Sequence, residues 1–263
     1  MGCPLKLYFQ WKYQDGLARQ VQMFPLETPG DQFTVRNARA KAQRVPKASE
    51  KVRVPKRPAT YHHGSLREAL LRAAERILER DGIQGLTRRA AAREAGVSHA
   101  APKNHFGDIA GLLSDLAAVG FQRIAATMQA GVRDTDPPGV RLEAVGRGYV
   151  SFARAHPGLF RLMYRSERLD MSRPALRDAL AASGRVLYGA VGAVREENLG
   201  GALTLAQAAH VAGAWSLVHG FATLLLDGPL NRLMAQLPPG TDADALLRAV
   251  LETSTLKNVE RKR

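Results

Sequence analysis

The side chains that could do chemistry gather in one short segment, which runs from Ser98 to Phe106. Small alanines in this segment allow close packing against a partner helix, whereas other positions carry hydrogen-bond donors. Donors on the outer side of a short helix can bond to base edges and to phosphate oxygens. The donor-bearing residues are His99, Lys103, Asn104 and His105.

This segment forms the second half of a longer pattern that spans residues 86–113. Thr87 can cap a short amphipathic helix, Gly96 supplies a turn, and Ser98 can cap a second short helix that ends near His105. The order of helix, glycine turn and polar helix is typical of a helix-turn-helix that reads DNA. The pattern therefore predicts a DNA-reading unit.

Other arrangements of reactive side chains are missing from the sequence. None of the seven histidines has HExxH spacing, and His62 and His63 lie near no cysteine or carboxylate partner. The sequence contains no GxSxG elbow, no phosphate-binding loop and no GxGxxG after a strand. Cys3 is the only cysteine, which excludes an intramolecular disulfide and fits a reducing compartment. We therefore expect a cytoplasmic protein with no enzymatic activity, no metal site and no cofactor.

Positive charge is concentrated near the N-terminus. The chain has a net charge of +14, and residues 1–60 contain twelve Lys or Arg against four Asp or Glu, a surplus of eight. This stretch shows no sustained helical or strand period and contains six prolines, so we expect a disordered basic tail. A second interpretation is that translation begins at Met23 or later.

The sequence predicts no secretory signal and no membrane span. The first sixteen residues lack an apolar core between their charges. The most apolar run, from Val211 to Leu226, is interrupted by His219 and is shorter than a typical span. We expect this run to be a buried helix.

Helical periodicity and capping residues predict the remaining elements. Ser65 and Glu68 form a capping box before a helix that ends at Asp81 and Gly82. We expect further helices from Asp108 to about Gln129, from 141 to 155, 157 to 164, 174 to 198, 204 to 226, and from 242 on. The fold class is therefore all-α, with a three-helix helix-turn-helix domain followed by a helical ligand-binding and dimerisation domain. The expected divisions are residues 1–60 for the tail, 61–124 for the DNA-binding domain and 130–256 for the C-terminal effector and dimerisation domain.

Residues 60–125 resemble the TetR family of bacterial transcriptional regulators, through Leu86-Thr87, Ala91, Ala95-Gly96-Val97-Ser98, His105-Phe106 and Leu112-Leu113. Two positions differ from the usual family pattern, because Lys103 stands where the family has Tyr and Ile109 where it has Lys. The resemblance implies contacts to DNA bases and phosphates, with the residues upstream of the first helix forming a basic arm in the minor groove. The implied DNA contacts are Arg57, Thr60, Thr87, Arg88, Ser98, His99, Lys103, Asn104 and His105.

Two segments of the second half, residues 155–163 and 215–221, resemble the C-terminal domain of one TetR subgroup, which is named for its Trp, His and Gly. Such a domain encloses a small ligand between apolar walls and a few polar groups. Packing in the hydrophobic core is the alternative role of each residue. The candidates for a ligand pocket are Tyr149, Phe152, Phe160, Met163, Tyr164, Trp215 and His219.

The same half has more apolar residues than one intramolecular face requires. The helix from Thr204 to Leu226 and the helix that follows Asp242 are therefore expected to pair with a second copy as a four-helix interface. The surplus residues are Leu224, Leu225, Leu226, Leu246, Leu247 and Val250.

These features together predict a homodimeric, ligand-responsive transcriptional regulator that binds a palindromic operator in double-stranded DNA. The family resemblance implies that such a regulator is more often a repressor than an activator. Its effector is expected to be a small apolar or amphipathic molecule. Two alternatives stay open. The chain could coat nucleic acid through its basic tail alone, or its helical half could bind other proteins without a small ligand.

Overall fold

The computed structural model describes residues 63–254, and the side chains from residue 66 on. The predicted tail over residues 1–60 lies outside the described residues. The predicted DNA contacts of Arg57 and Thr60 lie there too.

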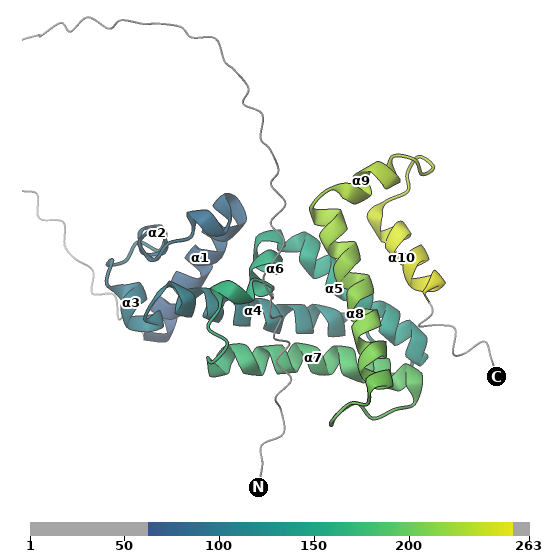
Figure 1. The fold of residues 1–263 in the computed structure, drawn as a ribbon. Coiled ribbons are helices and arrows are strands. Elements are labelled where there is room, and N and C mark those ends of the chain that lie inside the picture. The colour runs from purple at the N-terminus through teal and green to yellow at the C-terminus, as the bar shows by residue number, and fades with distance from the viewer. Residues whose placement is uncertain (1–62, 255–263) are drawn as a thin grey trace, which may run out of the picture. The chain divides into compact units, whose positions relative to one another are not determined.

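All regular secondary structure within residues 63–254 is helical, which confirms the predicted all-α fold (Figure 1). The elements are α1 His63–Gly85, α2 Arg88–Glu94, α3 Ala101–Phe106, α4 Ile109–Ala130, α5 Pro138–Ala155, α6 Pro157–Met163, the 3₁₀ turn η1 Ser166–Arg168, α7 Pro174–Arg195, α8 Leu205–Leu226, α9 Pro229–Met234 and α10 Ala243–Thr253.

Four helix starts follow the predicted caps. The side chains of Thr87, Asp108, Thr204 and Asp242 each accept a hydrogen bond from a backbone N–H three residues further on. At α8 the capping box is complete, because Gln207 also accepts from the backbone N–H of Thr204 at 2.9 Å. These caps satisfy N–H groups that have no partner inside the helix.

Three helix starts differ from the prediction. Helix α5 begins at Pro138, three residues before the predicted start at 141. Helix α1 begins at His63, two residues before the predicted cap at Ser65. Helix α3 begins at Ala101 rather than directly after Ser98, because residues 98–100 form a separate turn. In this turn the N–H of Ala101 donates to the carbonyl of Ser98 at 3.0 Å, and the N–H of Ala100 donates to the Ser98 hydroxyl at 3.3 Å. The short α9 was not predicted, because six residues span less than two helical turns.

Helix α4 is shared by the two predicted domains. Figure 1 shows α1, α2 and α3 together near the N-terminal end of α4, and α5, α6 and α7 also pack against it. One hydrophobic core contains Leu70 of α1, Leu116 of α4, Val150 of α5 and Leu176 of α7. Helix α4 therefore packs against both the helix-turn-helix and the second half. The predicted boundary between a DNA-binding domain that ends at residue 124 and an effector domain that begins at residue 130 stays a prediction.

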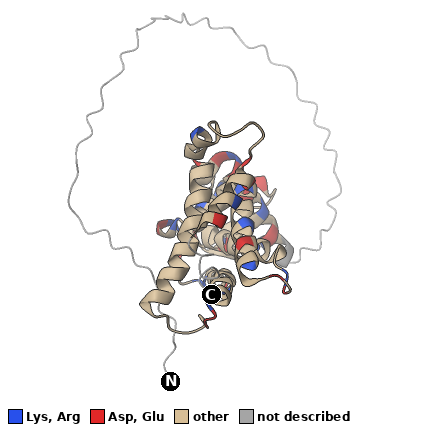
Figure 2. Ribbon diagram, turned by 90° about the vertical axis from the view of Figure 1, so that its right-hand side faces the viewer, with Lys and Arg blue, Asp and Glu red and all other residues tan. Residues whose placement is uncertain are grey.

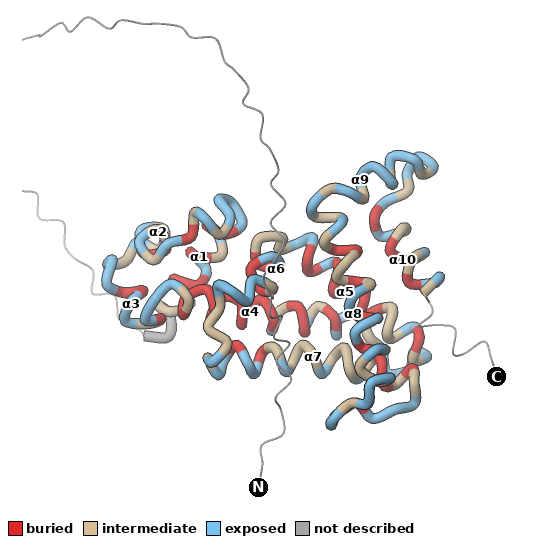
Figure 3. Tube along the Cα trace, viewed as in Figure 1, coloured by how far each residue is buried: buried red, intermediate tan, exposed pale blue. Residues whose placement is uncertain are grey.

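Two of the described helices are long and apolar enough to cross a membrane, judged by length and composition alone. In α4, 67% of the apolar window is buried within the chain, whereas in α8 only 28% is buried. The prediction of a buried helix over residues 211–226 is therefore wrong for most of α8 in the single chain (Figure 3). One side of α8 packs on α5 and α7, and the other side faces outward.

The predicted apolar surplus is also smaller than expected. Leu247 is only 2% exposed in the core of its own chain, and Leu225, Leu226 and Leu246 pack partly against the same core. Val250 does so as well, so Leu224 is the one exposed member of the predicted set. All six residues are apolar, as the sequence shows, but only the fold decides which of them are buried within a single chain.

Candidate nucleic-acid interface and effector site

Helix α3 has one apolar and one polar side. Ala101, Pro102 and Phe106 are buried against the neighbouring helices, whereas Lys103 and Asn104 are exposed. Because residues 101, 102 and 106 fall on one side of a helical turn, their burial forces the side chains of residues 103 and 104 outward. Two of the predicted donors, Lys103 and Asn104, therefore lie on a free surface.

The other predicted contacts of this unit lie around α3. Thr87 is exposed at the start of α2, and Ser98 and His99 are exposed in the turn before α3. His105 is half-buried, and its ring centroid lies 6.2 Å from that of Phe106. His105 is thus closer to the packed side than the other donors.

The two arginines at the start of α2 differ in what they contact. Arg88 donates from Nη1 to the carbonyl of Gly107 at 2.9 Å, which ties the start of α2 to the end of α3. The side chain of Arg89 is exposed and has no hydrogen bond or ion pair with another described residue. The sequence analysis named Arg88 as a DNA contact and did not name Arg89. The hydrogen bond from Arg88 to Gly107 could not be predicted from the sequence, because it depends on how α2 and α3 pack.

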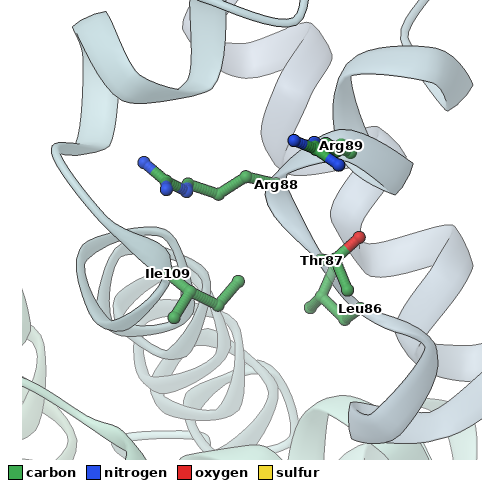
Figure 4. A pocket seen from close by; sticks show the side chains of 5 residues that line it. All are labelled: Leu86, Thr87, Arg88, Arg89 and Ile109. Carbon is green, nitrogen blue, oxygen red and sulfur yellow. The ribbon is translucent and has the colours of Figure 1, made fainter.

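Both arginines border an open depression of about 460 Å³ (Figure 4). Arg88 extends toward the start of α4, where Ile109 is 37% exposed. This is the position at which the sequence departs from the family's usual lysine. The depression is lined by Leu86, Thr87, Arg88, Arg89 and Ile109.

Ion pairs fix α2 against α1. Arg76 donates to Glu94 at 3.0 Å, and Arg80 lies 3.6 Å from the same carboxylate. The hydrogen bond from Arg76, helped by the charge of Arg80, holds the pKa of Glu94 below its ordinary value. The carboxylate therefore stays charged at neutral pH and keeps both arginines on this side of the unit.

A buried carboxylate, Asp115 of α4, connects three parts of the chain. Its side chain is 2% exposed and accepts from Arg67 of α1 at 2.8 Å. Arg173, the residue before α7, donates to both carboxylate oxygens, from Nε at 2.9 Å and from Nη2 at 3.0 Å. The bond to Asp115 holds the pKa of Arg173 above its ordinary value. Sequence reasoning missed this group, although Ser114 and Asp115 interrupt an apolar helix and could have signalled it.

A hydrogen-bonded group of rings lies in the second half. We call Tyr149, Phe160, Tyr164, Trp215 and His219 the aromatic cluster. The hydroxyl of Tyr149 lies 2.8 Å from the hydroxyl of Tyr164 and 2.8 Å from Nδ1 of His219. It also accepts from Nε1 of Trp215 at 3.3 Å. A phenol has one proton to donate and two positions to accept, so the three partners use its full capacity.

The rings of the aromatic cluster also pack edge to face. Tyr164 and His219 have ring centroids 4.6 Å apart, and Tyr149 and Phe160 have centroids 5.7 Å apart. Trp215 on α8 is 39% exposed, so the cluster reaches the surface of the single chain. Five of the seven predicted pocket residues are thus brought together from α5, α6 and α8.

Burial keeps the cluster neutral at physiological pH. It raises the pKa of Tyr164 to about 12 and raises the pKa of Tyr149 further above its ordinary value. It lowers the pKa of His219 below its ordinary value of 6.5. The cluster thus offers hydrogen bonds and ring faces without a formal charge.

The other two predicted pocket residues lie elsewhere. The ring of Phe152 is buried, with its centroid 5.2 Å from that of His156. Met163 packs against Gly120 of α4, where an added Cβ would lie 2.5 Å from its sulfur. Both positions fit core packing, and the role of all seven residues as ligand contacts stays a prediction.

Helix α6 is held at its N-terminus by α1. The carboxylate of Glu79 accepts from the N–H groups of Gly158 at 2.8 Å and Leu159 at 2.9 Å. An added Cβ at Gly158 would lie 2.9 Å from Glu79 Oε2, so glycine permits this close approach. Helix α6, which carries Phe160 and is followed directly by Tyr164, is therefore bonded to the helix-turn-helix unit.

Comparison with known proteins bears on both halves. A family model described as "Tetracyclin repressor-like, C-terminal domain" matches residues 142–253. Among curated proteins, none matches the chain.

Solved structures provide the second comparison. A protein with unknown function from Rhodococcus sp. RHA1 is 36% identical, with a TM-score of 0.60, and the match covers 74% of this chain and 95% of that one. A TetR-like transcriptional regulator from the same organism is 14% identical, with a TM-score of 0.51 and coverage of 80% and 100%. The TetR family transcriptional regulator PfmR from Thermus thermophilus is 16% identical, with a TM-score of 0.50 and coverage of 70% and 94%. The two structures with low identity show a shared fold.

Proposed function

Because this chain belongs to the TetR family of transcriptional regulators, we propose that it is a cytoplasmic homodimer that represses transcription at a palindromic operator and releases the operator when a small molecule binds. The observation that carries this proposal is the two-sided α3, which buries Phe106 and exposes Lys103 and Asn104. In a helix-turn-helix the second helix enters the major groove, where exposed amide and ammonium groups can bond to base edges.

Phosphate contacts come from the residues around the depression at the start of α2. Thr87 and Arg89 are exposed there, and Arg89 has no partner among the described residues. We expect Arg89 to supply the positive charge that Ile109 does not. Arg88 acts mainly by holding α2 to Gly107.

The test is DNA selection with the purified full-length protein, followed by footprinting on the selected sequence. A dimer protects two half-sites whose centres are about 34–36 Å apart, or a multiple of that spacing. Protection without paired half-sites contradicts the proposal.

Single substitutions separate base reading from phosphate binding. Asn104→Ala is expected to relax preference at one base position per half-site, at about 1–3 kcal/mol. Arg89→Gln is expected to weaken all sequences alike and to reduce the dependence of binding on salt by about one phosphate contact. Arg72→Gln is the control, because it removes the same single positive charge at an exposed position of α1. A uniform loss in Asn104→Ala would make Asn104 a phosphate contact instead.

The charge surplus in residues 1–60 supports an alternative, in which the tail binds nucleic acid without reading sequence. Deletion of residues 1–55 distinguishes the two. We expect the shortened protein to keep its preference for the operator and to lose overall affinity and part of its salt dependence. Loss of the preference itself would favour the alternative.

Dimerisation is proposed to use the outward side of α8. This helix contains no Lys, Arg, Asp or Glu and is tan along its length in Figure 2. Its exposed residues include Leu205, which is 89% exposed, and the small residues Ala209, Ala212 and Gly213. An uncharged helical side with small residues permits close contact with the same side of a second copy.

The oligomeric state tests this assignment. Ala212→Glu places a charge on the proposed interface and is expected to shift the protein from dimer to monomer in light scattering at fixed concentration. Ala181→Glu introduces the same change at an exposed position of α7 and is expected to leave the dimer intact. A dimer that survives Ala212→Glu would place the interface elsewhere.

The effector is proposed to be a small apolar or amphipathic molecule that packs against the aromatic cluster. The cluster supports this because it combines ring faces with an imidazole and two phenols that stay neutral at pH 7. A coupling of about 1–3 kcal/mol would change operator affinity about 5- to 150-fold.

In a Trp11→Phe background, Trp215 is the only tryptophan, and its fluorescence reports on the cluster. An effector is expected to change this fluorescence and to release operator DNA at the same concentration. His219→Ala is expected to weaken both effects together. Release without a fluorescence change would place the effector site elsewhere.

A further inference from the structure

The buried carboxylate of Asp115 lies between a residue that contacts α3 and a residue that precedes α7. Of its two oxygens, Oδ1 accepts from Arg173, and Oδ2 accepts from both Arg173 and Arg67. The two-point bond from Arg173 fixes the rotation of the carboxylate, which the single bond from Arg67 cannot do. Arg173 therefore determines where Oδ2 points and, through it, where Arg67 is held.

Arg67 continues this connection toward α3. Its guanidinium carbon lies 5.7 Å from the ring centroid of Phe106, the last residue of α3. The first turn of α4 packs tightly here, because an added Cβ at Gly111 would clash with the carbonyl oxygen of Phe106. The same Cβ would lie 3.1 Å from Nη1 of Arg173. The end of α3, the first turn of α4 and Arg173 thus occupy one tightly packed region.

Arg173 is also linked in sequence to the aromatic cluster. The segment from Tyr164 to Arg173 follows directly after α6, and the N–H of Asp170 within it donates to the hydroxyl of Ser114 at 2.8 Å. Ser114 and Asp115 are adjacent and buried on α4. A displacement of Tyr164 would therefore pull on the segment that these two residues hold.

We infer that Arg67, Asp115 and Arg173 form an ionic connection that positions α3, and that Arg173 acts on the DNA-reading helix without touching DNA. These are positioning residues, and the inference rests on the proposed role of α3 in DNA binding. Arg173 transmits the state of the second half by holding or releasing the Asp115 carboxylate, which in turn holds Arg67 over Phe106.

Hydrogen exchange of the free full-length protein provides the first test, because it needs neither an operator nor an effector. The readout is the amides of residues 104–107, including the N–H of Asn104 bonded to Ala100 and the N–H of Gly107 bonded to Lys103. We expect Arg67→Gln and Arg173→Gln each to speed exchange there roughly two- to fivefold, as loss of one cation–ring contact implies. Exchange in α8 and α10 stays as in the wild type.

A double variant and a matched control make the test specific. In Arg67→Gln, adding Arg173→Gln is expected to produce no further change at residues 104–107, because the connection is already broken. Arg177→Gln removes the same charge four residues further on, where the side chain donates to the carbonyl of Ser172, and it should leave this exchange unchanged. Arg173→Lys keeps the charge but not the two-point bond and should fall between the wild type and Arg173→Gln.

Two exchange results would overturn the inference. One is an unchanged rate at residues 104–107 in Arg173→Gln, and the other is an equal increase across α3, α8 and α10, which would show a loss of global stability. Once an operator has been selected, Arg173→Gln should lower the affinity for this operator roughly two- to fivefold and leave the salt dependence of binding unchanged. A reduced salt dependence would put Arg173 on the DNA and also overturn the inference. If no specific DNA is found, the proposed function fails. Hydrogen exchange at residues 104–107 still tests whether Arg67, Asp115 and Arg173 position α3.

Discussion

The substitution Tyr149→Phe removes one oxygen atom at the centre of the aromatic cluster. Tyr149 is only 5% exposed, and its hydroxyl has three hydrogen-bond partners, namely Tyr164, Trp215 and His219. The change adds no bulk and leaves the ring contact with Phe160 in place. Its effect therefore reports almost entirely on the hydrogen bonds.

The magnitude follows from how far each partner can regain water. Trp215 is 39% exposed and His219 is half-buried, so both can find solvent when the phenol oxygen is lost. Tyr164 is the most enclosed of the three partners, as the rise in its pKa to about 12 indicates. A buried polar group without a partner costs about 1–3 kcal/mol, so we expect a loss of about 2 kcal/mol in the free energy of unfolding.

Thermal and urea unfolding followed by circular dichroism measure this loss. For a chain of this size about 2 kcal/mol corresponds to a decrease in Tm of about 4–8 °C. Protein concentration must be fixed, because dimerisation shifts the apparent stability. Tyr188→Phe is the matched control, since no hydrogen bond links that hydroxyl to another described residue. A Tyr149→Phe protein within about 0.5 kcal/mol of the control would refute the hydrogen-bond network as a source of stability.

Three further predictions concern the second half and its links to α1 and α4. Burial lowers the pKa of His219, so below pH 6.5 the unfolded chain binds more protons than the folded chain. The free energy of unfolding therefore falls as the pH decreases through and below 6.5. His219→Gln should flatten this slope in urea midpoints measured from pH 7 to 5. Glu79→Ala removes the acceptor for two N–H groups of α6 and should lower the free energy of unfolding by about 1 kcal/mol, whereas Glu79→Gln should lower it less. Equal stability of the wild type and both variants in urea would show that water replaces the carboxylate. Gly148→Ala places a Cβ 2.5 Å from the carbonyl oxygen of Thr127, so it should force α5 away from α4 and lower the free energy of unfolding by at least about 1–3 kcal/mol. Gly184→Ala, which has open space around it, should lower nothing when both variants are compared in thermal unfolding.

The amino-acid sequence by itself determined most of the helices and the polarity of the reading unit. Thr87, Asp108 and Asp242 cap helices that begin where the sequence predicted, because a cap bonds to a backbone N–H only three residues away. The exposure of Lys103 and Asn104 opposite Phe106 also follows from helical spacing alone. Such features depend on interactions within one or two turns, so no knowledge of the fold is needed.

The tertiary structure decided which of those side chains are free and which are already bonded. Arg88 is bonded to Gly107 while the neighbouring Arg89 has no partner among the described residues, although both follow Thr87 in the sequence. Asp115 meets Arg67 across 48 residues and Arg173 across 58, and Tyr149 meets His219 across 70. Contacts between residues so distant in sequence form only when helices pack, and packing also leaves α8 exposed where its apolar composition alone predicted burial.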